Sequence, residues 1–555
     1  MSAMTNTERL DAGKSPEQLL AERGKRIEDA LQLKQPDRIP LQMPSGYFLA
    51  DYGGVTHREQ QDNWEKSQEL LEKVALDFQP DAILGLFNNP RPSLVLGDRM
   101  TKWPGYGLPD TGSFQFDEHE FMKAEDYDDF LRDPSDWAVR TYLPRAFKEL
   151  EGLQYLPPFG MWAFGHYNLG NLPMLASPPV KSSVEALGRA IDVALEDSAN
   201  MGKSVGRMAA LGFPPHFLAG ALIEAPFDFM SDTLRGMRGI MLDMLRRPDQ
   251  LLAAEEKVLR FQLEFALNFS AATGLKTAFI PLHRGSDGFM SLPQFERFYW
   301  PQLKEMMLVL VDNGIRPICF YEGVWDQRLK YLAELPRGKT AGWFQFSDIF
   351  KVKEVVGDTM CIIGGMRNSL LQSGTVEQVR DHTKKVCEVA GKGGGFIMSP
   401  GVGEMGGSNP DLVHEIHGSA RTWRCEMCGR TGPMEEMLER VAAGEEDPRC
   451  PACGGITRAT VVLFDGSPFH PDEGVLWRLA SEERVALFGT SPKYLAALEK
   501  SGYRPVDKVD LVNLRTVLST GSPLAHEQFD FVRDAIGPAI TLASLPGGTA
   551  HVPSF

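Results

Sequence analysis

The chain has 555 residues, of which 43% are hydrophobic and 24% are charged, so a disordered or low-complexity protein is excluded. Asp and Glu number 74 against 58 Lys and Arg, and the net charge of −16 argues against general binding to nucleic acids or anionic membranes. No run approaches the roughly 18–20 apolar residues of a membrane span. The N-terminus lacks the apolar core of a signal peptide, and a cytoplasmic protein is expected.

Eight strand–helix units are expected within about the first four hundred residues. The chain opens with a helix that Ser15 caps and Gln18 completes as a capping box. Strands follow at residues 38–43, 82–86, 216–222, 277–282, 316–321, 341–346, 359–363 and 395–399. They are short and apolar without strict alternation, as parallel strands buried on both faces are. The pattern predicts an α/β fold, a (β/α)8 TIM barrel over residues 1–405. An open doubly wound sheet is the alternative, but no Gly-x-Gly-x-x-Gly follows an early strand.

Polar residues follow the later strands of this barrel, at the end where barrel enzymes carry their chemistry. The cations Arg284 and Arg367, with His283 beside the first, are suited to binding an anionic substrate. The carboxyl groups are candidates for acid, base or metal ligand, and they belong to Asp287, Glu322 and Asp348. Each residue taken alone is more readily a helix cap or a surface ion pair than a site residue. Their convergence on one end of the barrel predicts a site.

Six motifs occur in a fixed order between about residues 24 and 403. They are Arg38-Ile39-Pro40, Pro226-Phe227-Asp228, Asp287-Gly288-Phe289-Met290-Ser291, Phe320-Tyr321-Glu322-Gly323, Asp348-Ile349-Phe350-Lys351 and Gly394-Gly395-Phe396-Ile397-Met398-Ser399. This order resembles the uroporphyrinogen decarboxylase superfamily. The resemblance implies a barrel enzyme with a small-molecule substrate. The superfamily includes decarboxylases, which are lyases of the haem pathway. It also includes methyltransferases that use a corrinoid cofactor carried on a partner corrinoid protein.

Two departures from the superfamily bear on the reaction. The true decarboxylases carry Arg-Gln-Ala-Gly-Arg just after the first strand, where this chain has Met43-Pro44-Ser45-Gly46-Tyr47. The zinc methyltransferases carry a His-x-Cys pair at a late strand end and a further Cys after the last strand. Here those places hold Phe320, Glu322 and Val402. The sequence therefore leaves open whether the barrel is a methyltransferase or a decarboxylase.

Four cysteines form two Cys-x-x-Cys pairs, Cys425 with Cys428 and Cys450 with Cys453, each pair followed by a glycine. The 21 residues from Gly429 to Arg449 separate the pairs. In a reducing compartment this pattern favours metal over disulfides. Two such pairs close a tetrahedral four-thiolate site, and we predict one structural zinc ion in a small ribbon.

A His417-Gly418-Ser419 triplet stands just before the cysteines. Together with them it resembles the zinc module of the sirtuin deacylases, over about residues 411–463. The triplet matches the family's catalytic histidine, which acts there as a base on the ribose of NAD. The glycine motif and Gln-Asn-Ile-Asp stretch of sirtuins have no counterpart before it. His417 is therefore interpreted as structural or vestigial, with residual NAD-dependent deacylation kept as an alternative.

The last segment, residues 464–555, carries Phe488-Gly489-Thr490-Ser491-Pro492 and Gly547-Gly548-Thr549. It resembles an internal stretch of acetoacetyl-CoA synthetase, an adenylate-forming ligase. Ala550 stands where that family has Asp, and its phosphate loop and lysine-bearing domain have no counterpart here. The segment is expected to be a partial α/β fold without ligase activity.

Three parts of different families thus follow one another, over residues 1–405, 411–463 and 464–555. The later two begin and end inside a domain, which favours an artificial join, as in a chimera or a mis-joined gene model. Two classes of function remain. The barrel is an enzyme for corrinoid-linked methyl transfer or for decarboxylation of a small anionic substrate, or the chain is a catalytically silent, zinc-stabilised binding or assembly protein.

Overall fold

The computed structural model describes residues 14–85, 89–158, 170, 173, 177–419, 422–424, 431–433, 472–482, 487–511, 514, 516–520, 526–537 and 540–545. The chain divides into two compact units, Met1–Gly455 and Ile456–Phe555. No helix in the described ranges is long and apolar enough to cross a membrane.

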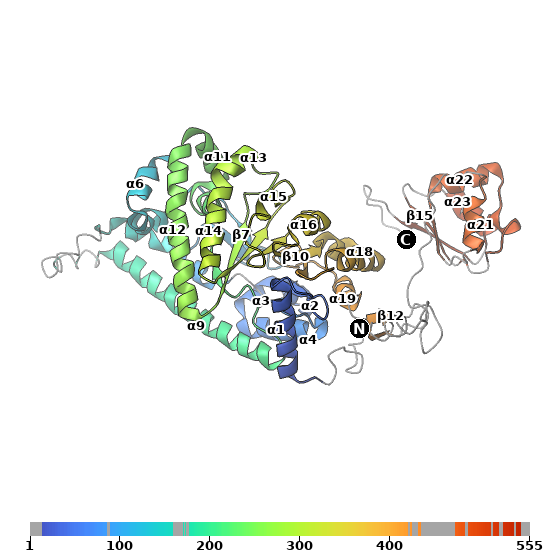
Figure 1. Ribbon diagram of the computed structural model, residues 1–555, viewed down its shortest axis with the longest axis horizontal. Helices are drawn as coiled ribbons and strands as arrows, with labels where there is room; N and C mark the ends of the chain where they lie inside the picture. Colours follow the sequence, from blue (N-terminus) through green and yellow to red (C-terminus); the bar gives the residue numbers. More distant parts are fainter. Residues whose placement is uncertain are drawn as a thin grey trace. The chain divides into compact units, whose positions relative to one another are not determined.

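Parallel strands form the centre of the first unit (Figure 1). They are β1 Gln42–Pro44, β2 Ala82–Leu84, β6 Ala221–Leu222, β7 Thr277–Leu282, β8 Arg316–Tyr321, β9 Ala341–Phe344, β10 Cys361–Met366 and β11 Phe396–Pro400. Six pair in the order β11-β10-β9-β8-β7-β6, and β1 pairs with β2. A parallel bridge from Leu41 to Met398 joins β1 to β11. All eight strands therefore run in the order β6-β7-β8-β9-β10-β11-β1-β2.

One buried cluster takes side chains from both ends of this strand order. Ala82 of β2 and Leu218, just before β6, pack in it with Trp343 of β9. Ile27 and Leu31 of helix α1 (Pro16–Leu31) belong to the same cluster. No ladder joins β2 to β6 in the described residues. Their shared cluster shows that the strands curl toward one another. The α/β fold with parallel strands is confirmed, and its strand order is that of a (β/α)8 barrel.

Helices surround the strands (Figure 1). After α1 they are α2 Phe48–Gly53, α3 His57–Asp62, α4 Trp64–Phe78, α5 Arg91–Leu96, α6 Tyr127–Arg132, α7 Pro134–Trp137, α8 Leu143–Ala146, α9 Pro178–Ala210, α10 Pro226–Asp228, α11 Gly236–Arg246, α12 Pro248–Thr273, α13 Leu292–Gln294, α14 Trp300–Asp312, α15 Leu329–Leu332, α16 Ile349–Val356, α17 Asn368–Ser373, α18 Val376–Val389 and α19 Pro410–Ser419. The same unit contains a 3-10 helix, η3 Lys148–Tyr155, and two π-helical segments, η5 Phe229–Arg235 and η6 Phe295–Tyr299. A large apolar core lies between strands and helices, including Val74, Met306, Val352 and Val386.

Strands β7 and β8 have the expected bounds and the other six differ from them, two of these for clear local reasons. Residues 216–220 form turns, with the Ala219 N–H donating to the His216 carbonyl, so β6 begins only at Ala221. Strand β10 runs on through Gly364 and Gly365, whose φ angles are +136° and +95°. Residues other than glycine rarely adopt such φ angles, so the two glycines allow the strand to continue to Met366. The capping box of Ser15 and Gln18 is present as expected.

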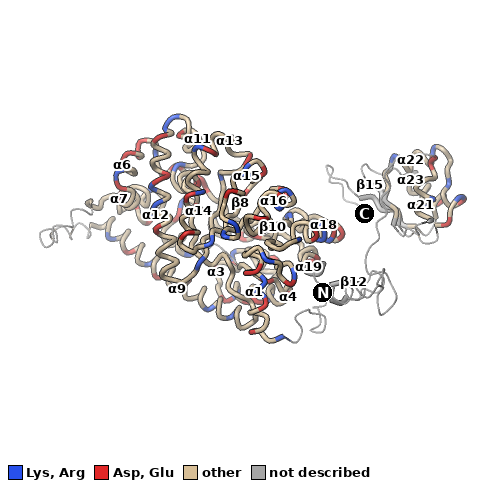
Figure 2. The backbone as a smooth tube through the Cα atoms, viewed as in Figure 1, with Lys and Arg blue, Asp and Glu red and all other residues tan. Residues whose placement is uncertain are grey.

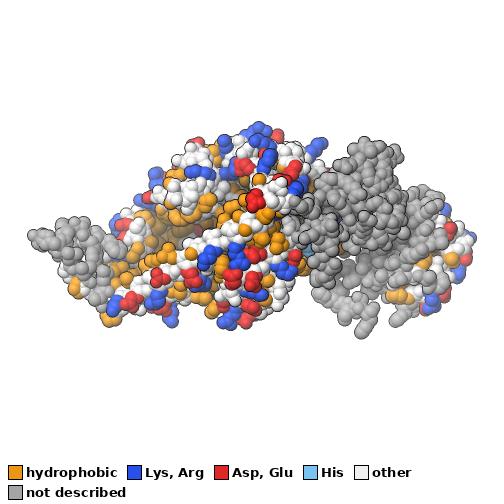
Figure 3. Space-filling model, turned by 90° about the horizontal axis from the view of Figure 1, so that it is seen from below, with side chains coloured by type: hydrophobic (Ala, Val, Ile, Leu, Met, Phe, Trp, Pro, Cys, Tyr) orange, Lys and Arg blue, Asp and Glu red, His pale blue; other side chains and the backbone are white. Residues whose placement is uncertain are grey.

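The surface of the first unit is mixed in character. Lys and Arg are interspersed with Asp and Glu along its helices (Figure 2). One face also exposes many hydrophobic side chains (Figure 3). The long helix α9 contributes to the exposed apolar surface with Val184, Ile191, Leu195 and Met201.

The region of the predicted zinc ribbon is only partly described. An antiparallel ladder pairs β12 (Thr422–Arg424) with β13 (Thr431–Pro433). Cys425 and Cys428 stand between these two strands in the sequence. They and the second pair, Cys450 and Cys453, lie outside the described residues, so the zinc site stays a prediction.

The second unit has a small parallel sheet of β14 (Leu487–Thr490), β15 (Thr516–Thr520) and β16 (Thr541–Leu545), in that order. Its helices are α21 Val475–Glu482, α22 Pro492–Ser501 and α23 His526–Ala535. Trp477, Leu495, Val517 and Val532 form a buried core between sheet and helices. This unit has the partial α/β character expected for the last segment.

Candidate functional site

His283 is the first residue after β7, and its imidazole lies between two carboxylates. Its Nδ1 atom is 2.5 Å from Oδ2 of Asp232, and its Nε2 atom is 3.4 Å from Oε1 of Glu322. Asp232 belongs to η5, which follows β6, and Glu322 is the first residue after β8. The ends of three neighbouring strands therefore supply this group. We call Asp228, Asp232, His283, Arg284 and Glu322 the His283 centre.

The charges of this group support one another. Burial acts to lower the pKa of His283, but the contacts with Asp232 and Glu322 outweigh burial and raise that pKa to about 11. Burial likewise acts to raise the pKa of Asp232, and the contacts with His283 and Arg284 lower it overall. At neutral pH the centre therefore holds an imidazolium beside an ionised Asp232.

Arg284 is held against the same aspartate. Its Nη2 atom lies 2.7 Å from Oδ1 of Asp232, and its Nε atom donates to Oγ of Ser231 at 3.1 Å. On its other side, Oε2 of Glu118 is 4.0 Å from Nη2. A guanidinium carries five N–H donors, so Arg284 retains donors for an anionic substrate.

Asp228 anchors the backbone beneath the centre. Its fully buried carboxylate accepts the backbone N–H groups of His283 and Arg284, both at 3.0 Å, and the hydroxyl of Tyr299 at 2.6 Å. The two backbone hydrogen bonds fix the first two residues after β7, and the hydroxyl of Tyr299 holds the carboxylate in place. Burial, with the nearby charge of Asp232, raises the pKa of Asp228 above its ordinary value.

Glu224, two residues after β6, adds a further half-buried carboxyl group. Burial raises its pKa to about 7, and the charge of Asp232 acts in the same direction. Its Oε2 atom is buried and has no hydrogen-bond partner. The sequence analysis did not identify Glu224, Asp232 or Tyr299. The one available signal was the spacing of Asp228 and Asp232, four residues apart, which places both on one side of a helical turn.

Three predicted site residues lie elsewhere at the strand ends. Asp287 pairs with the guanidinium of Arg328, and its Oδ2 atom accepts the N–H of Gln327 at 3.0 Å. Asp348 is the N-cap of α16, where its Oδ1 atom accepts the N–H of Phe350 at 3.0 Å. Arg367 is exposed after β10 and, within the described part of the chain, makes no ion pair. The structure thus brings His283, Arg284 and Glu322 together, while Asp287 and Asp348 bond to other groups.

The described residues offer no ready place for a metal. No group of three or more His, Cys, Asp or Glu side chains in these ranges is arranged to hold an ion. Cys319 and Cys361 are fully buried, and burial raises the pKa of each thiol to about 12, which disfavours the thiolate that a metal needs. His417 belongs to α19, but its side chain lies outside the described residues, as do the four predicted zinc ligands.

Comparison with known families matches separate parts of the chain. Residues 164–423 match the family model described as Uroporphyrinogen decarboxylase (URO-D), and residues 401–494 match the Sir2 family. A methyltransferase from Methanosarcina mazei superposes with a TM-score of 0.46 at 15% identity, over 72% of this chain and 98% of that chain.

Curated relatives match short stretches. Acetoacetyl-coenzyme A synthetase of Rhizobium meliloti (strain 1021) is 50% identical over 104 residues, which are 19% of this chain and 16% of that protein. The Gallus gallus synthetase is 40% identical over 99 residues, 18% of this chain and 15% of that protein. NAD-dependent protein deacetylase 2 of Streptomyces coelicolor is 42% identical over 64 residues, 12% of this chain and 27% of that protein. The chain spans less than a third of each relative. It joins segments similar to three families, which confirms the multi-part architecture inferred from the sequence.

Proposed function

We propose that the barrel is an enzyme that removes carbon dioxide from a small anionic substrate, with the His283 centre supplying the proton. The URO-D match over residues 164–423 supports the enzyme class. The observation that carries the chemistry is the imidazolium of His283 held between Asp232 and Glu322. Within the described ranges, His283 and Glu322 form the one ion pair between two of the expected site residues.

Decarboxylation needs a proton donor at the carbon that loses its carboxylate. The carbon–carbon bond breaks, carbon dioxide leaves, and the electron pair stays on the carbon until a proton arrives. Such a carbanion is far more basic than imidazole. The contacts with Asp232 and Glu322 raise the pKa of His283 to about 11, so His283 stays protonated throughout the neutral range and a proton is at hand when the carbanion forms.

The two carboxylates beside His283 have different tasks in this proposal. Asp232 is largely buried, bonds to Nδ1 and holds the ring in place. The side chain of Glu322 is 35% exposed, so it reaches the open end of the barrel. Glu322 passes the Nε2 proton of His283 to the substrate carbon. Arg284 and the exposed Arg367 bind the carboxylates of the substrate.

Methyl transfer to or from a corrinoid, carried as co-substrate on a partner protein, is the second candidate. The absence of arginines in residues 43–47, at the end of β1, favours this candidate. Tyr47 stands within the stretch that replaces Arg-Gln-Ala-Gly-Arg, and its fully buried ring stacks on His57 with centroids 4.3 Å apart. This place therefore lacks arginines for the carboxylates of a porphyrinogen. In methyl transfer from a substrate to the corrinoid, the proton of His283 would go to the substrate heteroatom that loses its methyl.

Parallel incubations separate these candidates. The purified full chain is mixed anaerobically with a porphyrinogen, and separately with methylcobalamin and a thiol, and both reactions are followed by absorbance. Carboxylate loss supports decarboxylation, and loss of the methylcobalamin spectrum supports methyl transfer. A His283→Gln variant should abolish either activity. Absence of both activities would favour a catalytically silent binding protein and would count against the proposal. NAD-dependent deacetylation of an acetyl-lysine peptide would instead assign activity to the segment around His417.

A further inference from the structure

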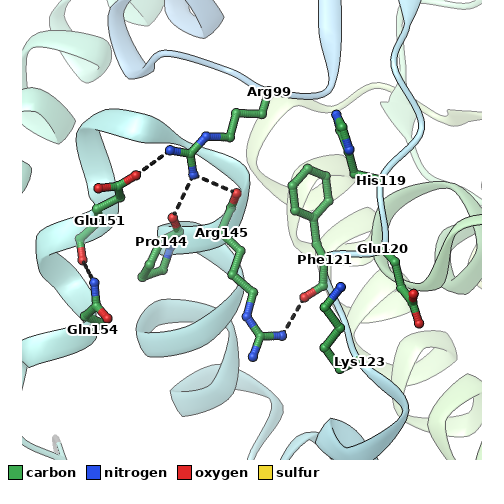
Figure 4. Close-up of a pocket in the computed structure, with 9 residues that line it drawn as sticks. All are labelled: Arg99, His119, Glu120, Phe121, Lys123, Pro144, Arg145, Glu151 and Gln154. Carbon is green, nitrogen blue, oxygen red and sulfur yellow. Dashed lines mark hydrogen bonds and ion pairs between the residues drawn. The ribbon is translucent and has the colours of Figure 1, made fainter.

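A cavity of about 510 Å³ lies outside the His283 centre (Figure 4). One wall is formed by His119, Glu120, Phe121 and Lys123 of the segment 117–123, and the opposite wall comes from α8 and η3. No residue of the His283 centre lines the cavity. The cavity and the His283 centre are nevertheless close in space. Glu118 lies 4.0 Å from Arg284, and the next residue, His119, lines the cavity. The volume falls in the range of small-molecule sites.

The segment 117–123 is fixed from behind, so this wall is preformed. The carboxylate of Glu118 accepts the N–H of Met237, at the start of α11. The carboxylate of Glu120 lies 2.6 Å from Nη1 of Arg235, whose side chain is 3% exposed. A preformed wall loses little conformational entropy when a ligand binds.

The charged groups of the cavity leave one cation without a partner. Glu120 is paired with Arg235, as above. Arg99 is paired with Glu151, and Arg145 with Asp126. Lys123 lines the same cavity and, within the described residues, makes no side-chain hydrogen bond or ion pair. After the pairs cancel, the uncompensated charge is positive, which favours an anion.

The same cavity offers an aromatic surface and further donors. The rings of Phe121 and His119 lie with centroids 5.5 Å apart on the wall that carries Lys123 (Figure 4). Across the cavity, Nη1 of Arg145 donates to the carbonyl of Phe121 at 2.6 Å, which holds this guanidinium at the site. The bonds of Arg145 leave N–H groups unused. A flat ring beside a cationic edge matches a planar organic anion.

We propose that this cavity binds a small planar organic anion, with Lys123 contacting the anionic group and the exposed ring of His119, which lies beside the buried ring of Phe121, contacting the plane. The site is separate from the proposed reaction and does not rest on it. It gives the barrel a second ligand next to Glu118, and thus next to the contact between Glu118 and Arg284.

Isothermal titration calorimetry of the full chain tests this proposal, with phenyl phosphate and inorganic phosphate as probes. Phenyl phosphate should bind more tightly than inorganic phosphate, because only the former has a ring. Lys123→Gln should weaken phenyl phosphate binding by about two- to fivefold, the range of an exposed ion pair. Lys123→Glu should weaken it further. The matched control is Lys384→Glu on α18, an exposed lysine far along the chain, which should bind as the wild type does.

Several outcomes would overturn the site. One is failure of the wild type to bind phenyl phosphate, and another is binding by Lys123→Glu equal to that by the wild type. Equal weakening in Lys384→Glu would indicate that binding depends only on the net charge of the protein. Binding lost in Arg367→Gln but kept in Lys123→Glu would place the anion at the proposed substrate site instead. Because binding is measured without turnover, failure here leaves the proposed reaction untouched, and an inactive barrel leaves this site untouched.

Discussion

His283 and Glu322 lie side by side because of the register between β7 and β8. Leu282 pairs with Tyr321 in the parallel ladder, and each strand ends there. The next residues, His283 and Glu322, therefore emerge together, and Nε2 of the first lies 3.4 Å from Oε1 of the second. A shift of one residue in this register would turn one of the two side chains to the other face of the sheet.

Replacing Glu322 tests its place in catalysis. Glu322→Ala should lower any measured turnover by more than about tenfold, the low end for losing an acid–base group. Thermal stability should be nearly unchanged, because the side chain is 35% exposed. The control is Glu354→Ala on α16, an exposed glutamate that should keep full turnover. Equal turnover in the two variants would contradict the role given to Glu322.

Asp287 is expected to stabilise the fold through Arg328. The Arg328 side chain is only 1% exposed, and its Nη2 atom donates to the Met290 carbonyl at 2.5 Å. Asp287→Ala leaves a buried cation without its carboxylate, which should cost about 3 kcal/mol of unfolding free energy in urea denaturation. The double variant Asp287→Ala with Arg328→Met should recover part of this loss. A stable Asp287→Ala protein without turnover would point to a catalytic carboxyl group instead.

Glu224 should make stability depend on pH. Its folded pKa of about 7 exceeds the ordinary 4.5, so its contribution is fully present below pH 4.5 and is lost as the pH rises through 7. The stability of the wild type relative to Glu224→Gln should therefore fall by about 2–3 kcal/mol between these values. Denaturant midpoints measured across this pH window check the prediction, and Glu354→Gln should follow the wild type. A constant difference between wild type and Glu224→Gln would mean that burial does not shift this carboxyl group.

The four paired cysteines should bind one zinc ion per chain. Cys425, Cys428, Cys450 and Cys453 are expected to hold it tetrahedrally, with zinc–sulfur distances near ~2.3 Å. Metal analysis of protein purified without chelator should find close to one equivalent, which is lost when any of the four is changed to serine. Cys387→Ser should keep the metal. Four freely titratable thiols and no zinc would refute the site.

Local sequence patterns were enough for much of the barrel. The strands at residues 277–282 and 316–321 coincide with β7 and β8. They are predictable because a parallel strand buried on both faces is a short apolar run, a property of adjacent residues. The pattern of apolar residues was less informative where unusual backbone angles set the end of a strand. Gly364 and Gly365 look like loop residues in the sequence, yet they extend β10.

The candidate site was likewise predictable only in part from the sequence. The sequence shows that the polar residues His283, Arg284 and Glu322 follow strands. It also shows the motifs by which each segment resembles a family. The partners of these residues were decided only by the tertiary structure. Asp287 looked equivalent to Glu322, but Arg328, 41 positions later, takes its carboxylate. Asp232 contacts His283 from 51 positions away. Strand propensity and capping act between near neighbours, whereas the pairing of charges depends on which loops the parallel strands bring together.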